Sequence, residues 1–169
     1  MHPILTLLAI ALVVVGIQLS TRYWRSRRLV QWMKRGMVAY QAKRFDEALR
    51  AFRKCVRIAP EWLYARTLLS ISLAQSGEKE QALDEIRMVE ALQPRETETW
   101  ALISMFYAVC MPDNAEPLVD ALERVMALDL RAARDLLEHP AFARARKAPQ
   151  VQALQERIAA SAAVSTSNP

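Results

Sequence analysis

The sequence predicts an all-α protein in which an N-terminal apolar helix precedes a short solenoid of helical hairpins. Three observations support this fold class: the 169 residues include only three glycines, apolar residues recur at helical spacing, and two segments repeat at a fixed distance. Scarce glycine disfavours tight β-turns and phosphate-binding loops, because both need residues that tolerate positive φ. The recurrence of apolar residues at i, i+3 and i+4 favours helices with one buried face.

The first predicted element is a transmembrane helix within residues 1–21. Residues 3–21 carry no formal charge, and at about 1.5 Å per residue they are just long enough to cross the apolar core of a bilayer. A cleaved signal peptide usually carries Lys or Arg before its apolar segment and a small-x-small motif after it. Neither is present, which favours a retained anchor.

A basic flank over residues 22–28 follows the apolar segment. Its cations and aromatic rings are typical of side chains in the lipid headgroup layer. A flank that sets topology is favoured over specific recognition of an anionic lipid, and the positive-inside rule then places residues 22–169 in the cytosol. We therefore expect a single-pass protein of the inner membrane with the membrane-interface residues Arg22, Tyr23, Trp24, Arg25, Arg27 and Arg28.

The basic residues are concentrated near the N-terminus. Residues 1–45 contain eight Lys and Arg and no acid, whereas the rest of the chain carries 15 Lys and Arg against 18 Asp and Glu. A nucleic-acid-binding domain usually spreads its basic residues over one face of the fold. The distribution favours contact with a membrane, and nucleic acid is not an expected partner.

Two segments of the chain align without a gap at a distance of 34 residues, RFDEALRAFRKCVRIAP and EKEQALDEIRMVEALQP. This period is that of the tetratricopeptide repeat, a helix–turn–helix unit, and the sequence resembles that family. Residues 29–62 match its pattern of aromatic, glycine, alanine, aromatic and proline at Trp32, Gly36, Ala48, Phe52 and Pro60. Small residues at such positions let paired helices approach closely, and proline ends the second helix.

Two further repeats are expected after the first, because one helical hairpin cannot bury its own apolar face. Residues 63–96 keep the alanine and proline at Ala82 and Pro94, but have Arg66 where the family prefers an aromatic residue and Ser70 where it prefers glycine. Residues 97–130 form a degenerate repeat with a longer turn. Together, residues 29–130 are predicted to be the repeat region.

A capping segment is predicted over residues 131–158, with a helix, an irregular linker and a second helix. It resembles the short closing module that follows tetratricopeptide arrays in many bacterial proteins. Its role would be to cover the last exposed helix face, and the small, polar residues 159–169 are expected to be disordered. The likeness is carried by Asp135, Leu136, Leu137, Pro140, Phe142, Pro149, Val151 and Leu154.

No combination of residues predicts catalysis, a cofactor or a metal site. Cys55 and Cys110 are far apart without a CxxC spacing, which favours buried, reduced thiols. His139 lies beside a proline that ends a helix, so we expect a capping or surface role for it. The sequence predicts no enzyme activity.

The resemblance implies a site for partner proteins, because tetratricopeptide arrays bind mainly through the first helix of each repeat, which lines a concave groove. This groove is mostly apolar and has methionines at two places where co-chaperones of the family carry polar residues that clamp a carboxylate. An amphipathic helix or peptide of a partner is therefore favoured. The implied residues are Val30, Met33, Met37, Tyr40, Tyr64, Thr67, Ile71, Gln75, Ala101, Met105 and Ala108.

An equally weighted alternative is that the protein's own C-terminal helix fills the groove through Val151, Leu154 and Ile158. The predicted function is a membrane-anchored adaptor that brings other proteins to the cytoplasmic face of the inner membrane. The competing hypothesis is an accessory or assembly subunit of an integral membrane complex, with Ile4–Leu19 also contacting its neighbours. The partner's identity and the oligomeric state stay open.

Overall fold

The computed structural model describes residues 25–166, and every regular element in that range is a helix. The chain divides into two compact units, one ending at Pro60 and the other beginning at Glu61. These helices confirm the predicted all-α class. The predicted anchor over residues 1–21 lies outside the described residues, and no helix from residue 25 to residue 166 combines the length and apolarity needed to cross a membrane.

The first unit contains one helical hairpin, which consists of a helix over residues 25–41 and α2, Phe45–Ile58. The turn between them places Lys43 at a φ of 57°. Along α2 the side chains of Ala48, Phe52 and Cys55 are fully buried. The predicted close approach at Gly36 is confirmed, because a Cβ placed there would lie 2.5 Å from an edge carbon of the Phe52 ring.

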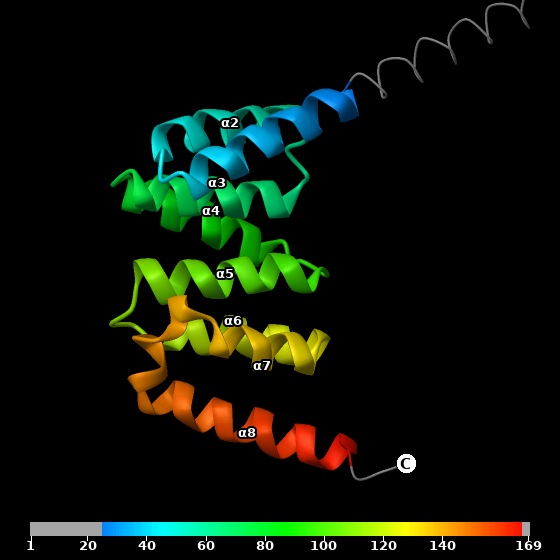
Figure 1. The fold of residues 1–169 in the computed structure, drawn as a ribbon, viewed down its shortest axis with the longest axis vertical. Helices are drawn as coiled ribbons and strands as arrows, with labels where there is room; N and C mark the ends of the chain where they lie inside the picture. Colours follow the sequence, from blue (N-terminus) through cyan, green and yellow to red (C-terminus); the bar gives the residue numbers. More distant parts are fainter. Residues whose placement is uncertain (1–24, 167–169) are drawn as a thin grey trace, which may run out of the picture. The chain divides into compact units, whose positions relative to one another are not determined.

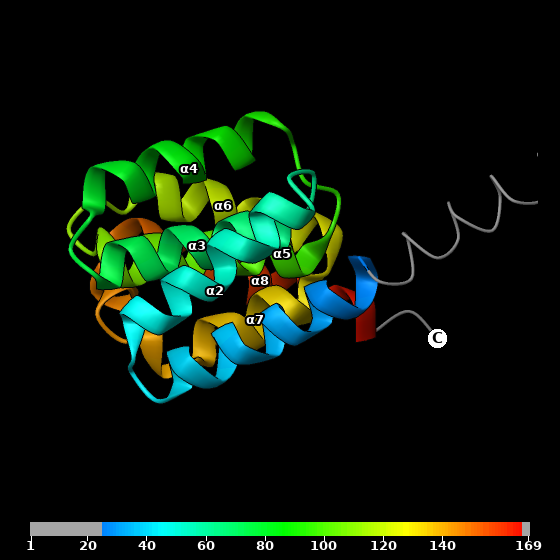
Figure 2. The same cartoon turned by 90° about the horizontal axis from the view of Figure 1, so that it is seen from above.

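The second hairpin consists of α3, Leu63–Gln75, and α4, Lys79–Ala91, which pack side by side (Figure 2). Gly77 ends α3 at a φ of +94°, and the following amide donates a hydrogen bond to the Leu73 carbonyl. This left-handed conformation is the usual helix-ending role of glycine. Ala82 is fully buried at the α4 side of the hairpin.

Polar residues inside α3 are satisfied within the helix itself. The hydroxyls of Thr67, Ser70 and Ser72 donate to the carbonyls four residues earlier, at distances of 2.9–3.0 Å. This pairing removes the cost of burying a free hydroxyl. Serine at position 70 therefore fits where the repeat pattern prefers glycine.

The third hairpin joins α5, Thr97–Cys110, to α6, Glu116–Leu128. Helix α5 also packs against α3, so the hairpins of the second unit stack as successive layers (Figure 1). The indole of Trp100 donates a hydrogen bond of 2.7 Å to the Pro94 carbonyl. This bond ties the start of α5 to the end of the preceding repeat.

The chain ends with α7, Leu130–Glu138, two short 3-10 turns, Pro140–Phe142 and Ala145–Lys147, and α8, Pro149–Thr166. Helix α8 packs against α6 and α7 and buries Val151, Leu154 and Ile158. Its extent differs from the predicted disordered tail over 159–169, because the helix continues to Thr166. Residues 159–166 are rich in alanine and contain no glycine or proline, a composition that sustains a helix.

Candidate protein-binding site

The predicted groove residues of the first unit share one face of helix 25–41. Val30 is 66% exposed, whereas Met33, Met37 and Tyr40 are half-buried. Their spacing of three and four residues aligns them along the helix. The ring of Tyr40 also packs edge-on against Phe45, with 5.7 Å between centroids. This face presents flexible apolar side chains, which suit an adaptable contact.

The predicted groove residues of the second unit are only partly accessible. Tyr64, Gln75, Ala101 and Met105 are half-buried. Thr67, Ile71 and Ala108 are buried, with exposed fractions of 0%, 3% and 2%. The last three side chains therefore belong to the packed interior of this structure and do not present a surface to a partner.

The alternative occupant of the groove, the C-terminal helix, lies elsewhere in the second unit. Val151, Leu154 and Ile158 are buried where α8 meets α6 and α7, and it is the 3-10 turn Pro140–Phe142 that contacts α5. Phe142 within that turn is fully buried. Proline at 140 and 149 separates the two helices and leaves α8 free to continue the stack beyond α7.

The predicted membrane-interface residues fall into two groups. Arg22, Tyr23 and Trp24 lie outside the described residues, whereas Arg25, Arg27 and Arg28 are exposed on helix 25–41. The guanidinium of Arg25 donates hydrogen bonds to the Ile58 carbonyl at the last residue of α2. A cation at this place is also attracted to the negative end of the α2 dipole. Arg25 therefore stabilises the first hairpin.

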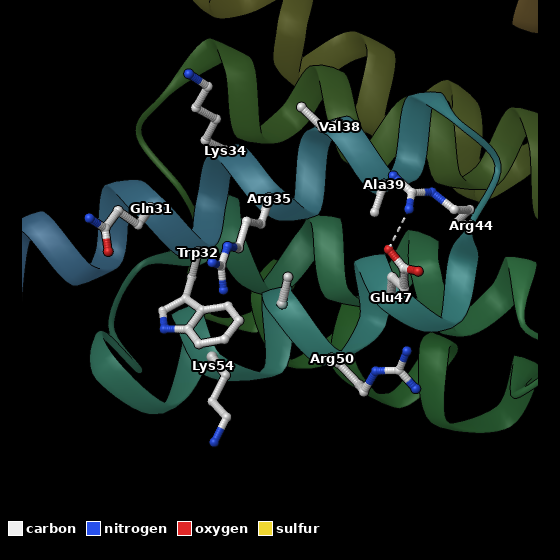
Figure 3. Close-up of a pocket in the computed structure, with 11 residues that line it drawn as sticks. Gln31, Trp32, Lys34, Arg35, Val38, Ala39, Arg44, Glu47, Arg50 and Lys54 are labelled. Atoms are coloured by element: carbon white, nitrogen blue, oxygen red, sulfur yellow. Dashed lines mark ion pairs between the residues drawn. The ribbon is translucent and has the colours of Figure 1, made fainter.

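The first unit also contains a cleft that the sequence analysis did not predict, called here the first-hairpin cleft (Figure 3). It has a volume of about 820 Å³ and lies between helix 25–41 and α2. The residues that line it are Gln31, Trp32, Lys34, Arg35, Val38, Ala39, Arg44, Glu47, Arg50, Ala51 and Lys54. The available signal was the i, i+4 spacing of Arg50 and Lys54, which places two cations on one face of a helix.

A smaller, acidic hollow of about 450 Å³ lies in the second unit, around the starts of α3 and α5. Trp62 and Tyr64 stack in it with 6.0 Å between ring centroids, and Glu61, Glu96 and Glu98 line its rim. Tyr64, one of the predicted groove residues, also lines this hollow.

An intrarepeat ion pair explains the unusual Arg66. Its guanidinium lies 2.8 Å from the Glu85 carboxylate, and both side chains are largely shielded from solvent. Arg66 on α3 thus holds α4 in place by charge at a position where the repeat pattern prefers an aromatic ring. A second side-chain contact joins α4 to α5. The neutral Tyr107 hydroxyl on α5 donates a hydrogen bond of 3.0 Å to the Glu90 carboxylate on α4.

The chemically reactive side chains Cys55, Cys110 and His139 lie in surroundings that indicate a structural role. Burial raises the pKa of the Cys55 and Cys110 thiols to about 11, and both thiols are free. The His139 ring nitrogen Nδ1 accepts a hydrogen bond from the Ala141 amide and caps the 3-10 turn, which confirms the predicted capping role. Within residues 25–166, no three His, Cys, Asp or Glu side chains gather closely enough to hold a metal ion.

Comparison with protein families gives a match within the first hairpin. Residues 31–62 match the tetratricopeptide repeat, and this range covers most of the first helical hairpin. No curated protein and no solved structure matches the chain. The first hairpin is thus similar in sequence to a tetratricopeptide repeat, a unit that generally binds other proteins, and α3–α4 and α5–α6 follow it as further helical hairpins.

Proposed function

We propose that this protein is a membrane-anchored adaptor that binds other proteins at the cytoplasmic face of the inner membrane. The match of residues 31–62 to the tetratricopeptide repeat carries the proposal, because such repeats serve as protein-binding modules. The uncharged residues 3–21 and the basic residues that follow support the membrane location and orientation.

The contact surface proposed for the partner is the face of helix 25–41 that carries the exposed Val30 and the half-buried Met33 and Met37. Unbranched methionines adapt to different apolar shapes, which suits an amphipathic helix or an apolar peptide. Within the second unit, Tyr64, Gln75 and Met105 are half-buried and form a separate candidate contact.

Partner capture by the full-length protein tests this proposal. The tagged chain would be purified from host membranes in mild detergent after chemical crosslinking, and its partners identified by mass spectrometry. Met37→Glu should remove the specific partners because it places a carboxylate in an apolar contact. Gln152→Glu is the matched control, since it puts the same charge on an exposed position of α8.

The stability of the Met37→Glu variant shows whether Met37 contacts a partner or belongs to the core. If Met37→Glu lowers the free energy of unfolding by more than about 2 kcal/mol, Met37 belongs to the core and the proposed surface is wrong. Co-purification of integral membrane partners that survives deletion of residues 29–169 would instead favour an assembly subunit that acts through its anchor.

A further inference from the structure

We propose that the first-hairpin cleft binds an acidic, partly apolar helical segment of a partner protein. The inference rests on the proposed adaptor function and names the chemistry of the partner. The site differs from the methionine-bearing face described above, since Met33 and Met37 do not line the cleft.

The cleft carries excess positive charge. Arg35, Arg50 and Lys54 line it and are exposed, and no described side chain forms an ion pair with them. The acid among the lining residues, Glu47, is already paired with Arg44 at 2.9 Å. A partner's carboxylates would therefore meet unneutralised cations, with which they form strong charge-assisted hydrogen bonds.

The base of the cleft is apolar. Ala39 and Ala51 are buried there, Val38 is 50% exposed, and the indole of Trp32 is half-buried. The Arg35 guanidinium lies 5.2 Å from the Trp32 ring centroid, and Figure 3 shows these two side chains next to each other between the helices. Apolar side chains of a partner can be buried on this base while their acidic neighbours reach the cations.

The shape of the cleft suits a bound helix. Its lining residues recur along both walls at helical spacing, over residues 31–39 and 44–54. At about 1.5 Å per residue, the shorter wall extends for roughly 12 Å, or about two turns of a bound helix. Grooves between two helices accept a third helix by interlocking side chains.

A polypeptide fits these features better than a lipid surface. A planar headgroup layer would contact outward-pointing cations such as Lys34, which points away from Trp32 and Arg35 in Figure 3. The buried alanines at the base of the cleft, in contrast, are reached only by side chains that enter it. The anionic lipid is therefore kept as an outcome of the experiment.

Fluorescence anisotropy with synthetic peptides tests the inference on the full-length protein in dodecylmaltoside micelles. Three labelled helical peptides of about 18 residues, or five turns, would share one leucine face and carry Glu, Gln or Lys at the remaining positions. The Glu peptide should bind at least about tenfold more tightly than the Gln and Lys peptides, a difference of about 1.4 kcal/mol. Its affinity should also fall as salt is added.

Two double variants locate the binding site. Arg50→Glu with Lys54→Glu should weaken binding of the Glu peptide by about tenfold or more, because it reverses the two cations of the 44–54 wall that form no ion pair within the described residues. Lys43→Glu with Arg57→Glu makes the same change in net charge on exposed residues of the same hairpin outside the cleft. Circular dichroism would check that both variants keep the parent's helicity, and Arg50→Gln with Lys54→Gln provides a milder cleft variant.

Three results would overturn the inference: equal affinity for the three peptides, equal weakening by both charge-reversed pairs, or displacement of the Glu peptide by phosphatidylglycerol in mixed micelles as effectively as by unlabelled peptide. The last result would assign the cleft to lipid headgroups. If the cleft variants keep the natural partners captured through the Met37 face, the adaptor function stands and the cleft inference alone fails.

Discussion

Gly36 is the residue at which the two helices of the first hairpin come together. Phe52 is fully buried opposite it, and a Cβ on residue 36 would lie 2.5 Å from the ring. Real side-chain contacts do not reach that distance, so the ring or the helices would have to shift. The glycine is thus required by packing, since its role in this place is to leave out a methyl group.

Gly36→Ala should therefore destabilise the protein, although alanine is normally the better helix former. Overpacking in a core costs about 1–3 kcal/mol, whereas the gain in helix propensity is at most about 1 kcal/mol. We expect a net loss in the free energy of unfolding, measured by urea titration of the full-length protein with circular dichroism. In a Phe52→Leu background the same change should cost less, and equal costs in both backgrounds would contradict the contact.

Glu90 is a half-buried carboxyl whose pKa is raised by burial, although the hydrogen bond from Tyr107 opposes the shift. Burial also raises the pKa of the Tyr107 hydroxyl, and the negative charge of Glu90 raises it further. A carboxyl with a raised folded-state pKa stabilises the fold most at pH values below its unfolded pKa of about 4.3. That contribution is lost as the pH rises through the folded pKa.

Glu90→Gln should remove this pH dependence, because the amide stays neutral and its oxygen still accepts the Tyr107 hydrogen bond. The stability of the variant relative to the parent should increase from about pH 4 to about pH 7. Urea unfolding across that range measures the difference, and Glu156→Gln, at an exposed position of α8, should leave it flat. Parallel curves for Glu90→Gln and the parent would show that burial of Glu90 is unimportant.

At the scale of elements, we expect the hairpins to depend on small residues where their helices cross. Ala48 on α2 and Ala82 on α4 both have an exposed fraction of 0%, and they are 34 residues apart in the sequence. Equivalent burial at equivalent places of two hairpins is the structural counterpart of the sequence repeat. Both methyl groups are completely enclosed, so we expect a longer side chain at either position to displace its neighbours.

Ala48→Arg and Ala82→Arg should each disrupt their hairpin. A long cation forced into a buried contact adds overpacking and the cost of an unpaired charge, on the order of several kcal/mol. Loss of helicity and a lower melting temperature would be measured by circular dichroism. Ala91→Arg is the matched control because residue 91 is exposed at the last residue of α4; a similar loss there, or none at 48 and 82, would contradict the proposed crossings.

At the scale of the whole molecule, charge is divided sharply between the two ends of the chain. Residues 1–60 contain twelve Lys and Arg against two acids, whereas residues 61–169 contain eleven against sixteen. Long-range fields of this kind guide partners and orient a protein at a charged surface. The basic end is also the end that carries the apolar segment.

The proposed cytoplasmic orientation is based on this charge distribution and is testable. A reporter that is active only in the cytoplasm should work when fused after Pro169, and one active only in the periplasm should stay silent, because basic flanks remain cytoplasmic. N-terminal sequencing of the membrane-bound protein is the accompanying measurement. The opposite reporter pattern would reject the cytoplasmic orientation, and a mature chain that starts near Ser20 or Thr21 would show that the apolar segment is a cleaved signal.

Much of the fold was predictable because it depends on local patterns. The apolar spacing and the 34-residue repeat predicted helical hairpins, Gly36 predicted a close contact, and the prolines at 140 and 149 predicted a break between two helices. Each of these inferences needs only the helical period and the conformational limits of glycine and proline.

The sequence by itself thus determined the helical class, the hairpin repeat and the concentration of basic charge near the N-terminus. The tertiary structure decided which residues are available to a partner: it buried Thr67 and Ile71, placed α8 on α6 and α7, paired Arg66 with Glu85, and opened a cationic cleft beside Trp32. The physical reason is that periodicity specifies the face of a helix on which a residue lies. Burial and charge pairing depend on which residue of another helix meets that face.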